Sequence, residues 1–334
     1  MKKILFVGLG SIGQRHLTNA MKIFNDYEFY ALRETNHNLI IKETKLIKKR
    51  SLQKEFKIKE VFRKTKDALN LKPNIVFVCN PTSKHLDTCI AYSKIGSHIF
   101  VEKPLGSDLN KYKKLKKLVN KNKLITFVGY QTRFHPGIKF IKNVLKDNTY
   151  GKVISSNFTC TTYLPKHHTY EDYKKSYVSI KKLGGGTSLN LSHEIDLIYY
   201  FFGMPKKVIC YKNNPAIIKT ETENDVHASL FYKDRSIVKL ELSYSSFYEK
   251  RNIEIKFNKC LILFNLLTGE MKVITKNKTQ IKKFIIPRNE LFFSELKHFK
   301  NLIDKKINKN ALSIPNHENI LKLIKKNIKS KILE

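Results

Sequence analysis

The sequence predicts an α/β chain in which a doubly wound parallel sheet is followed by a second α/β region with a mostly antiparallel sheet. Short apolar runs alternate with helical periodicity over the first 130 residues, which is the pattern of βαβ units. Further along the chain, apolar runs follow one another with few helices between them. The length of 334 residues allows about two domains, so we place the first at 1–130 and the second at 131–334.

Five strands and three helices are expected in the first domain. The run 75–79 is continuously apolar, which suits a strand that is buried on both faces. Because strands and helices alternate at this spacing, we expect right-handed crossovers and a parallel sheet with helices on both sides. The expected strands are 4–7, 28–32, 75–79, 98–101 and 125–129, and the expected helices begin at Ser11 and span 83–94 and 108–119.

Alternating apolar and polar residues predict an antiparallel sheet in the second domain, with hairpins at 233–235 and near Asn258. The segment 164–186 is polar and aromatic and ends in glycines, so we expect a loop there. The expected strands are 153–163, 208–211, 226–232, 237–244, 253–257 and 260–264, and the expected helices are 189–202, 290–304 and 316–332.

The formal net charge is +36, from 64 basic against 28 acidic residues, and only eight of the basic residues are arginines. Proteins that read nucleic acids favour arginine for its bidentate contacts, whereas these lysines are spread along the whole chain. We therefore interpret the charge as a compositional bias and expect no nucleic-acid partner. A nucleic-acid binder stays open as an alternative that rests on charge alone.

The sequence predicts neither a membrane span nor a disulfide framework. No apolar run reaches 18 residues, and the basic, apolar start is too short for a signal peptide. The five cysteines include no CxxC pair, which favours free thiols in a reducing compartment. We therefore expect a cytoplasmic location, no membrane partner and no metal site.

A glycine-rich turn directly follows the first expected strand and opens the first expected helix. In a Rossmann fold the first glycine permits the tight turn, the second lets the backbone approach a pyrophosphate, and the third lets the helix pack closely on the strand. The amides at the helix N-terminus then hold the phosphates. An ordinary glycine turn is the alternative, but this placement favours a dinucleotide site at Gly8, Gly10, Ser11, Ile12 and Gly13.

Arg33 and Glu34 lie about 20 residues further on, where a Rossmann fold places the residue that contacts the ribose. An acidic residue at this position favours NAD, whereas an arginine favours the 2′-phosphate of NADP. Both types are present, so the sequence leaves NAD and NADP open. We favour NADP because Arg33 comes first, and a solvated arginine without a ligand is the alternative.

Polar segments follow two of the expected strands, 75–79 and 98–101. Ligands of doubly wound sheets bind outside the carboxyl ends of the strands, so both segments are candidates for the cofactor site. A lysine at such an end can donate to an alkoxide or carbonyl oxygen while charge shifts during hydride transfer. The residues assigned to this site are Asn80, Pro81, His85, Glu102 and Lys103.

His193 lies in the first turns of the helix expected at 189–202, and Asp196 shares its face because it is three residues later. An imidazole titrates near neutrality and is the commonest acid/base group. A structural histidine is the alternative. The loop 163–177 carries tyrosines and cations that could hold hydroxyls, a carboxylate or phosphates, so it is the candidate substrate loop, with a surface loop folded on itself as the alternative.

Together these motifs resemble the glucose-fructose oxidoreductase/inositol dehydrogenase/rhizopine-catabolism (Gfo/Idh/MocA) family over essentially the whole chain. The resemblance implies a Rossmann domain, a C-terminal α/β domain with a large open sheet that often forms dimers or tetramers, and NAD(P)-dependent chemistry at a sugar or cyclitol carbon. Three further segments are similar to a subgroup associated with bacterial surface sugars. The family motifs are 8–13, 80–82, 102–104, 128–136 and 184–196, and the subgroup segments are 163–165, 170–177 and 191–196.

The resemblance also implies roles for two residues of the first domain. The family's Glu-Lys-Pro lysine, which lies near the nicotinamide and the reacting oxygen, corresponds to Lys103. The family's amide after Gly-Tyr corresponds to Gln131, which we add to the cofactor site.

The second catalytic position is less clear, because relatives often pair an acid with a His or Tyr four residues later. Counting from the glycines gives Asn190 and Glu194, whereas counting from His-x-x-Asp gives Leu189 and His193. A carboxylate is missing at the acid position either way. We favour His193 as the acid/base group, because an imidazole can exchange a hydroxyl proton, and we assign Asn190 to orienting it or the substrate.

These observations predict an NAD(P)-dependent enzyme that transfers a hydride reversibly between a nicotinamide and a carbinol carbon of a sugar, cyclitol or nucleotide-sugar. Lys103 is expected to stabilise the developing oxyanion and His193 to exchange the hydroxyl proton. The missing carboxylate keeps a non-catalytic dinucleotide-binding or sensor protein as the alternative. The expected substrate contacts are Tyr163, Lys166, Tyr170, Asn190 and His193.

Overall fold

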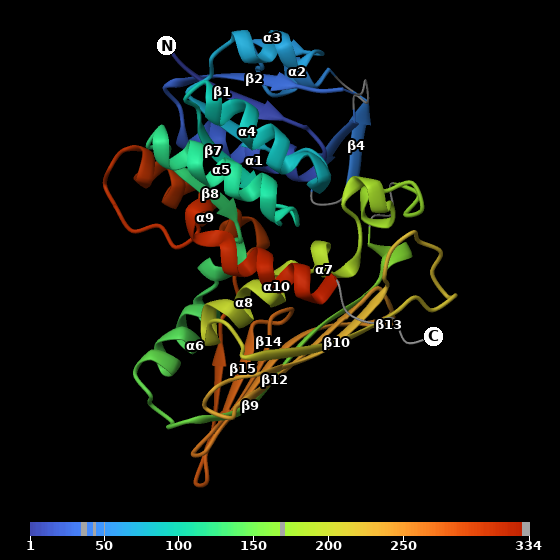
Figure 1. Ribbon diagram of the computed structural model, residues 1–334, viewed down its shortest axis with the longest axis vertical. Coiled ribbons are helices and arrows are strands. Elements are labelled where there is room, and N and C mark those ends of the chain that lie inside the picture. Colours follow the sequence, from blue (N-terminus) through green and yellow to red (C-terminus); the bar gives the residue numbers. More distant parts are fainter. Residues whose placement is uncertain (35–38, 43–44, 50, 168–170, 329–334) are drawn as a thin grey trace.

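The computed structural model contains two large sheets at opposite ends of the long axis of the molecule, together with one two-stranded sheet (Figure 1). It describes the chain except for residues 35–38, 43–44, 50, 168–170 and 329–334. The N-terminal sheet and its helices form the upper part of the view, and the C-terminal sheet forms the lower part. The helices α7, α8 and α10 lie between them (Thr187–Asn190, Ser192–Phe202 and Glu318–Ile328).

The first sheet has six strands in the order β5-β2-β1-β6-β7-β8, and every pairing is parallel. All four side chains of β6 are fully buried, as expected for a strand covered on both faces. The parallel α/β prediction is therefore confirmed. The strands are Lys2–Val7, Tyr27–Leu32, Glu60–Phe62, Ile75–Val78, His98–Glu102 and Thr126–Gly129, for β1, β2 and β5–β8. The helices of this part are Ser11–Ile23, Leu52–Glu55, Thr65–Asn70, His85–Lys94 and Leu109–Lys121, for α1–α5.

A row of phenylalanine rings crosses one face of this sheet and binds the C-terminal part of the chain to it. Phe6, Phe77, Phe100 and Phe127 occupy matching register positions on four strands, with ring centroids 4.5, 5.0 and 5.4 Å apart in that order. Phe299 of α9 (Arg288–Ile303) packs on this row, 5.7 Å from Phe100. Aromatic pairs of this kind add about 0.5–1.5 kcal/mol each to the burial term. The helix α9 therefore belongs to the core of the first sheet although it follows the second sheet in sequence.

The second sheet has eight strands in the order β10-β11-β12-β9-β13-β14-β15-β16, and only the β9–β12 pair is parallel. Phe158 of β9 contacts Phe201 of α8, so this helix covers one face of the sheet. The mostly antiparallel prediction is confirmed. The strands are Val153–Tyr163, Lys207–Asn213, Asp225–Phe231, Ile237–Ser243, Ser245–Phe257, Leu261–Asn265, Glu270–Ile274 and Thr279–Lys283, for β9–β16.

The expected helix 189–202 is wrong at its start, because the backbone breaks at Leu191 into α7 and α8. At the break the Asn190 carbonyl oxygen accepts a hydrogen bond from Lys103 Nζ of the first part, at 2.6 Å. The helix α6, Pro136–Lys146, was not expected; it begins where His135 caps the amide of Gly137.

Several short strands were not expected from the sequence. The hairpin β3–β4 spans Leu39–Lys42 and Lys45–Lys49, β5 has three residues, and β15 and β16 end the second sheet. The strand β13 begins at Ser245 rather than at 253, and its pairing with β9 shifts register between Ser245 and Lys250. Lysine-rich strands such as β16 are typical of sheet edges, where the charge discourages pairing with a strand of another molecule. The same lysines replace the apolar residues whose alternation would have predicted a strand.

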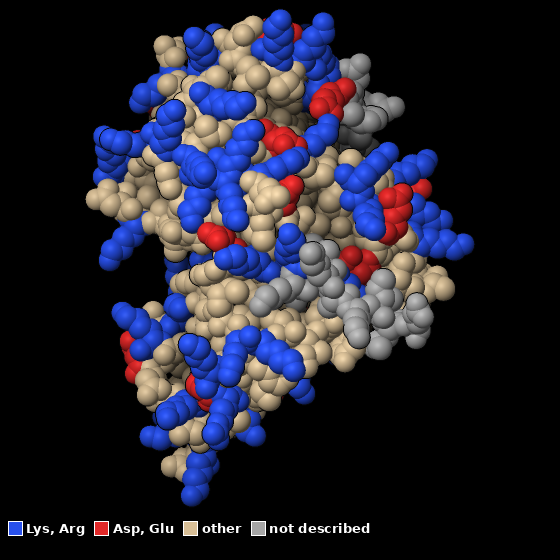
Figure 2. Space-filling model, in the orientation of Figure 1, with Lys and Arg blue, Asp and Glu red and all other residues tan. Residues whose placement is uncertain are grey.

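Lysine and arginine side chains are distributed over both parts of the molecule rather than gathered over one element (Figure 2). All five cysteines are unpaired and buried. No helix in the described part of the chain has the length and apolar character that crossing a membrane requires.

Candidate functional site

The glycine turn between β1 and α1 leaves an open cradle at the helix N-terminus. Gly8 has φ +92°, and a Cβ there would lie 2.7 Å from Cys79 O, whereas a Cβ on Gly13 would lie 2.3 Å from Gly8 O. Gly10 has nothing within 4 Å of its Cβ position, and no side chain caps the helix that begins at Ser11. The amides of Ser11 and Ile12 have no hydrogen-bond acceptor among the described residues, so this turn fits the pyrophosphate of a dinucleotide.

The residues after β6 are held by hydrogen bonds that leave one acceptor unused. Asn80 Nδ2 donates to Thr88 Oγ1 at 2.9 Å, while Asn80 Oδ1 is buried without a partner among the described residues. The two ring nitrogens of His85 each lie 2.8 Å from a carbonyl oxygen, Nδ1 from that of Pro104 and Nε2 from that of Asn80, so the ring links the segments that follow β7 and β6. Pro81 starts the turn that leads into α4.

Gln131 shows the same feature on the neighbouring element, because its Oε1 is also buried without a partner in the described part of the chain. Gln131 starts the 3₁₀ turn that follows β8. Buried acceptors are normally satisfied, so Asn80 and Gln131 have two oxygens ready for donors. Ribose hydroxyls and a carboxamide NH₂ are the donors that a nicotinamide cofactor carries, so these residues fit such a group.

Arg33 and Glu34 lie at the tip of β2, as expected, but in different environments. The Arg33 side chain is buried, and its pKa is lowered by burial and then by the charge of Arg63. The exposed Glu34 carboxylate is ion-paired with Lys84 Nζ at 2.6 Å. The ribose region therefore holds two neighbouring guanidinium groups and a carboxylate that is already paired.

Glu102 points into the protein interior rather than toward open space. Its Oε1 lies 2.5 Å from His16 Nε2, and its Oε2 accepts from the Lys103 amide at 3.1 Å. Glu295 of α9 completes a buried group of three, whose nearest ligand-type atoms all lie within 4.8 Å of one another. Two ligands of one zinc ion lie about 3 Å apart or more, so the shorter His16–Glu102 distance is that of a direct hydrogen bond.

Lys103 stands at the carboxyl end of β7 and reaches across to the second part of the chain. Its Nζ donates to Asn190 O at 2.6 Å. Burial lowers the pKa of Lys103, and the charges of Glu102 and Glu194 oppose that shift. The ammonium group therefore gives up its proton more easily than an exposed lysine does.

The Asn190 side chain is fixed at both ends by tyrosine hydroxyls. Its Nδ2 donates to the hydroxyl of Tyr244, and its Oδ1 accepts from the hydroxyl of Tyr177 at 3.2 Å. Tyr244 lies fully buried between β12 and β13, and Tyr177 belongs to the candidate substrate loop. These contacts hold Asn190 and, through its carbonyl oxygen, the position of Lys103.

His193 lies in the first turn of α8, close to Lys103. Its Nδ1 is 3.3 Å from Thr132 Oγ1, and the edge of its ring meets the Tyr130 ring with centroids 5.5 Å apart. The pKa of His193 lies well below its ordinary value, first because of burial and then because of the charges of Lys103, Arg251 and Arg288. The imidazole is therefore neutral at physiological pH.

Two ion pairs that the sequence did not indicate hold α8 in place. Arg133 donates to both carboxylate oxygens of Asp196 at 2.8 and 2.7 Å, and both side chains are buried. Asp196 thus supports the histidine helix through Arg133. Arg251 of β13 donates to Glu194 Oε1 at 2.7 Å. The only hint in the sequence was that arginines are rare in this lysine-rich chain.

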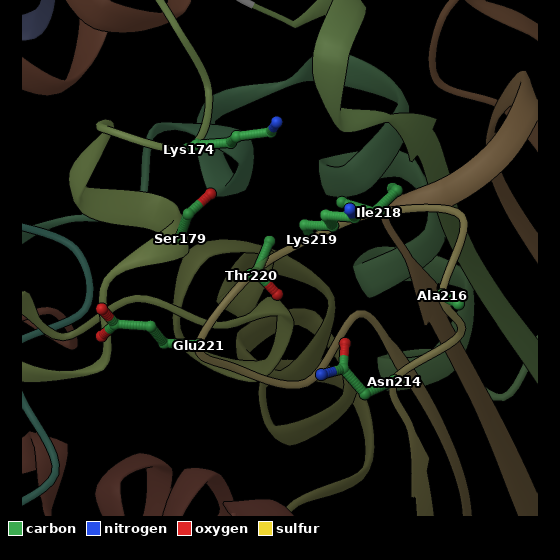
Figure 3. Close-up of a pocket in the computed structure, with 8 residues that line it drawn as sticks. All are labelled: Lys174, Ser179, Asn214, Ala216, Ile218, Lys219, Thr220 and Glu221. Carbon is green, nitrogen blue, oxygen red and sulfur yellow. The ribbon is translucent and has the colours of Figure 1, made fainter.

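The candidate substrate loop contributes unevenly to this site. Tyr163 packs on Phe247 with ring centroids 4.7 Å apart, Lys166 is exposed, and Tyr170 lies outside the described residues. A surface pocket of about 440 Å³ lies between Lys174 and Ser179 of this region and a loop from Asn214 to Glu221 (Figure 3). None of its lining residues is one of the predicted site residues, so the pocket lies apart from Lys103 and His193.

Comparison with family models supports the two-part architecture. Residues 2–130 match the oxidoreductase family model with an NAD-binding Rossmann fold, and residues 138–262 match the GFO/IDH/MocA C-terminal domain. The myo-inositol 2-dehydrogenase of Thermotoga maritima is 26% identical over 204 residues, which are 60% of this chain and 55% of that protein. The scyllo-inositol 2-dehydrogenase (NAD⁺) of Bacillus subtilis is 30% identical over 38% of this chain and 35% of that protein. The chain thus spans about half or less of these curated relatives.

Solved structures match over nearly the whole chain. Levoglucosan dehydrogenase in complex with NADH superimposes with a TM-score of 0.82 at 15% identity, covering 98% of this chain and 95% of that one. The WlbA dehydrogenase of Bordetella pertussis, in complex with NADH and UDP-GlcNAcA, gives a TM-score of 0.79 at 16% identity, with 98% and 95% covered. At these identities the matches confirm the fold.

Proposed function

Because this chain belongs to the Gfo/Idh/MocA family of oxidoreductases, we propose that it transfers a hydride to or from a carbinol carbon of a sugar, cyclitol or nucleotide-sugar, using NAD or NADP. One observation carries the proposal. Lys103 of the first part donates to Asn190 O in the second, and its charge lowers the pKa of His193, three residues further on. Lys103 follows β7, which lies between β6 and β8, the strands that lead to the unpartnered oxygens of Asn80 and Gln131. The inositol and sugar dehydrogenases that the chain is similar to support this substrate class.

The chemistry divides between the cofactor and the side chains of this chain. When bound, the cofactor supplies the nicotinamide that accepts or donates the hydride. Gly10 and the amides after it would hold the pyrophosphate, and Asn80 and Gln131 would accept hydrogen bonds from the ribose and carboxamide. Lys103 and His193 would flank the reacting oxygen, where they stabilise its negative charge and exchange its proton.

Single-turnover hydride transfer tests these assignments. We expect a panel of sugars, cyclitols and nucleotide-sugars to contain a substrate that reduces bound NAD(P)⁺, with the change in nicotinamide absorbance as the readout. The variants Lys103→Ala and His193→Ala should each lose at least roughly 10²-fold in rate, the lower end of acid–base contributions. Lys113→Ala, an exposed lysine of α5, is the matched control and should keep the wild-type rate. Wild-type rates in both site variants would disprove the assignment.

We propose that the ribose region favours NADP over NAD. The support is the pair of neighbouring guanidinium groups of Arg33 and Arg63, together with the pairing of Glu34 to Lys84. A 2′-phosphate would gain charge-assisted hydrogen bonds in such a region. The ratio of kcat/KM for the two cofactors tests this, and a ratio in favour of NAD would contradict it.

A non-catalytic dinucleotide-binding or sensor protein is the second candidate. The observation in its favour is Asn190, which stands where relatives often have an acid and has both ends of its side chain bonded to tyrosines. Cofactor binding measured by calorimetry, with no turnover across the same panel, would support this candidate over the enzyme.

Four broader assignments also belong to this proposal. We propose a domain division at residues 130/131 and a homodimer or homotetramer that forms through the face of the second sheet opposite α8. Asn157 and Thr159 of β9 alternate with Phe158, so they lie on that face. Light scattering after gel filtration tests the oligomer. The unpaired buried cysteines support a role in a reducing cytoplasm, and the named UDP-sugar dehydrogenases among the structural neighbours support a role in surface-sugar synthesis.

A further inference from the structure

A short chain of hydrogen bonds connects Arg251 to His193 through Thr132. Arg251 Nη2 lies 3.4 Å from Thr132 Oγ1, and the same oxygen lies 3.3 Å from His193 Nδ1. Thr132 is 3% exposed and His193 is 8% exposed, so water does not replace these contacts freely. Arg251 itself is held by Glu194, its ion-pair partner at 2.7 Å.

The chemistry of the three groups fixes the direction of this chain. A guanidinium group only donates, so Thr132 Oγ1 accepts from Arg251. The hydroxyl has one hydrogen of its own, and among the described residues His193 Nδ1 is the acceptor in reach. If Nδ1 carried the imidazole hydrogen, the Thr132 hydroxyl hydrogen would be buried without an acceptor, which costs about 1–3 kcal/mol. Nδ1 is therefore the acceptor, and the hydrogen of the neutral ring is on Nε2.

We propose that Arg251 and Thr132 are positioning residues that hold His193 in its Nε2–H tautomer, so that His193 donates a hydrogen bond to the reacting oxygen and Lys103 exchanges the proton. This proposal rests on the proposed function. His193 Nε2 has no hydrogen-bond partner among the described residues and is not sealed from solvent, so it is free to meet a substrate. The roles of His193 and Lys103 are thus the reverse of those expected from the sequence.

A neutral imidazole that donates through Nε2 does not readily lose that hydrogen, because an imidazolate would remain. It acts instead as a neutral donor to an oxygen that gains negative charge, a known use of histidine in enzymes. Lys103 can take the proton because burial lowers its pKa. Its hydrogen bond to Asn190 O occupies only one position on Nζ, so the nitrogen can also reach the substrate oxygen.

In the oxidation direction, the hydroxyl proton of the substrate moves to the lone pair of the neutral Lys103 amine. The carbinol hydrogen leaves with its electron pair as a hydride to NAD(P)⁺, and the carbon–oxygen double bond forms. In the reverse direction the Lys103 ammonium group returns the proton. His193 keeps its proton throughout and stabilises the alkoxide-like oxygen.

The arrangement also explains how the site works without the carboxylate that relatives often have. Asn190 makes its side-chain hydrogen bonds with Tyr177 and Tyr244 and none with His193 among the described residues. The ring is oriented instead by Thr132 and, through Thr132, by Arg251. A carboxylate beside a ring nitrogen accepts a hydrogen bond from it and so keeps the hydrogen on that nitrogen. The Thr132 hydroxyl instead donates to Nδ1, which favours the tautomer with the hydrogen on Nε2.

Long-range ¹H–¹⁵N correlation spectra of protein labelled with ¹⁵N-histidine test the proposal directly, with and without NAD(P)⁺. The His193 signals are assigned by their loss in His193→Gln. We expect the wild-type pattern of a neutral Nε2–H ring at pH 7. Thr132→Val should lose this bias and lower the single-turnover rate roughly tenfold, the effect of one hydrogen bond, whereas Thr132→Ser should restore both.

Two results would overturn the proposal: a neutral Nδ1–H ring in the wild type, or an unchanged Nε2–H ring in Thr132→Val. The wild-type spectrum decides even if the valine variant does not fold. The tautomer is measured without turnover, so an Nε2–H ring in a protein that oxidises no member of the sugar panel would count against the proposed function and leave the tautomer assignment standing.

Discussion

Replacing Glu295 by glutamine is expected to stabilise the protein, by an amount that grows with pH. The Glu295 side chain is fully buried, and neither carboxylate oxygen has a hydrogen-bond partner among the described residues. The pKa of Glu295 lies well above its ordinary value, chiefly because of burial and then because of the charge of Glu102. The folded protein therefore holds the Glu295 proton to a higher pH than the unfolded chain does.

The magnitude follows from proton linkage. The unfolded chain releases the Glu295 proton near pH 4.3, whereas the folded chain keeps it to a much higher pH. Stability therefore falls as pH rises from about 4.3 toward the folded pKa, by about 1.4 kcal/mol per pH unit. The accumulated cost therefore grows with every pH unit that separates the unfolded pKa from the folded pKa. Glutamine has a similar size and does not titrate, so Glu295→Gln should recover this cost.

Equilibrium urea unfolding at pH 5, 6, 7 and 8 measures the effect. The difference in unfolding free energy between Glu295→Gln and wild type should be small at pH 5 and grow by about 1.4 kcal/mol per pH unit as the pH rises toward the folded pKa of Glu295. Glu290→Gln, an exposed position on the same helix, is the matched control and should show no such slope. A difference that is constant with pH, or a variant less stable than wild type at pH 7, would refute the reasoning.

Three further predictions concern the ion pair, the histidine and the ribose region. Arg133→Met leaves the Asp196 carboxylate buried and unpaired, so the free energy of unfolding in urea should fall by about 3–5 kcal/mol. The double variant Arg133→Met/Asp196→Leu removes the buried charge as well and should recover most of this loss. Equal losses in the single and the double variant would contradict this reasoning. Burial and then the nearby cations hold the pKa of His193 well below 6.5. Below about pH 6.5 the unfolded chain therefore binds a proton at this histidine, whereas the folded chain does not, so the free energy of unfolding should fall as the pH drops. His193→Gln should weaken that loss in unfolding measured between pH 5 and 7, and an unchanged slope would argue against a neutral His193. Arg33→Ala should raise KM for NADP by roughly tenfold or more and change KM for NAD by less than about twofold, with steady-state kinetics as the measurement; equal changes for both cofactors would contradict a 2′-phosphate contact.

Much of the first sheet and its cofactor residues could be predicted because their signals are local. A buried parallel strand is a continuous apolar run, as in Ile75–Val78, and the turn after it is found by counting. Lys103 differs from the many other lysines of the chain because it directly follows such a strand. The glycine turn needed nothing beyond its own residues and the strand before it.

The parts of the fold that were missed are short or lysine-rich, so burial leaves little trace in their sequence. The edge strand Thr279–Lys283 alternates only partly buried side chains with exposed ones. At the break between α7 and α8, the Asn190 carbonyl oxygen accepts a hydrogen bond from Lys103, which is 87 residues away in the chain. No local pattern marks such a break.

The sequence by itself determined that this chain has a dinucleotide turn, a lysine at a strand end and a histidine on an apolar helix. Only the tertiary structure decided what surrounds them: Arg251 and Thr132 beside His193, Glu295 beside Glu102, and two tyrosines on Asn190. The physical reason is that apolar periodicity records which face of an element is buried, whereas a hydrogen-bond partner from a distant strand depends on sheet order and register. A slip of one residue in the pairing of β13 with β9 would turn Arg251 to the other face of the sheet. The apolar runs that predict the strands do not specify this register.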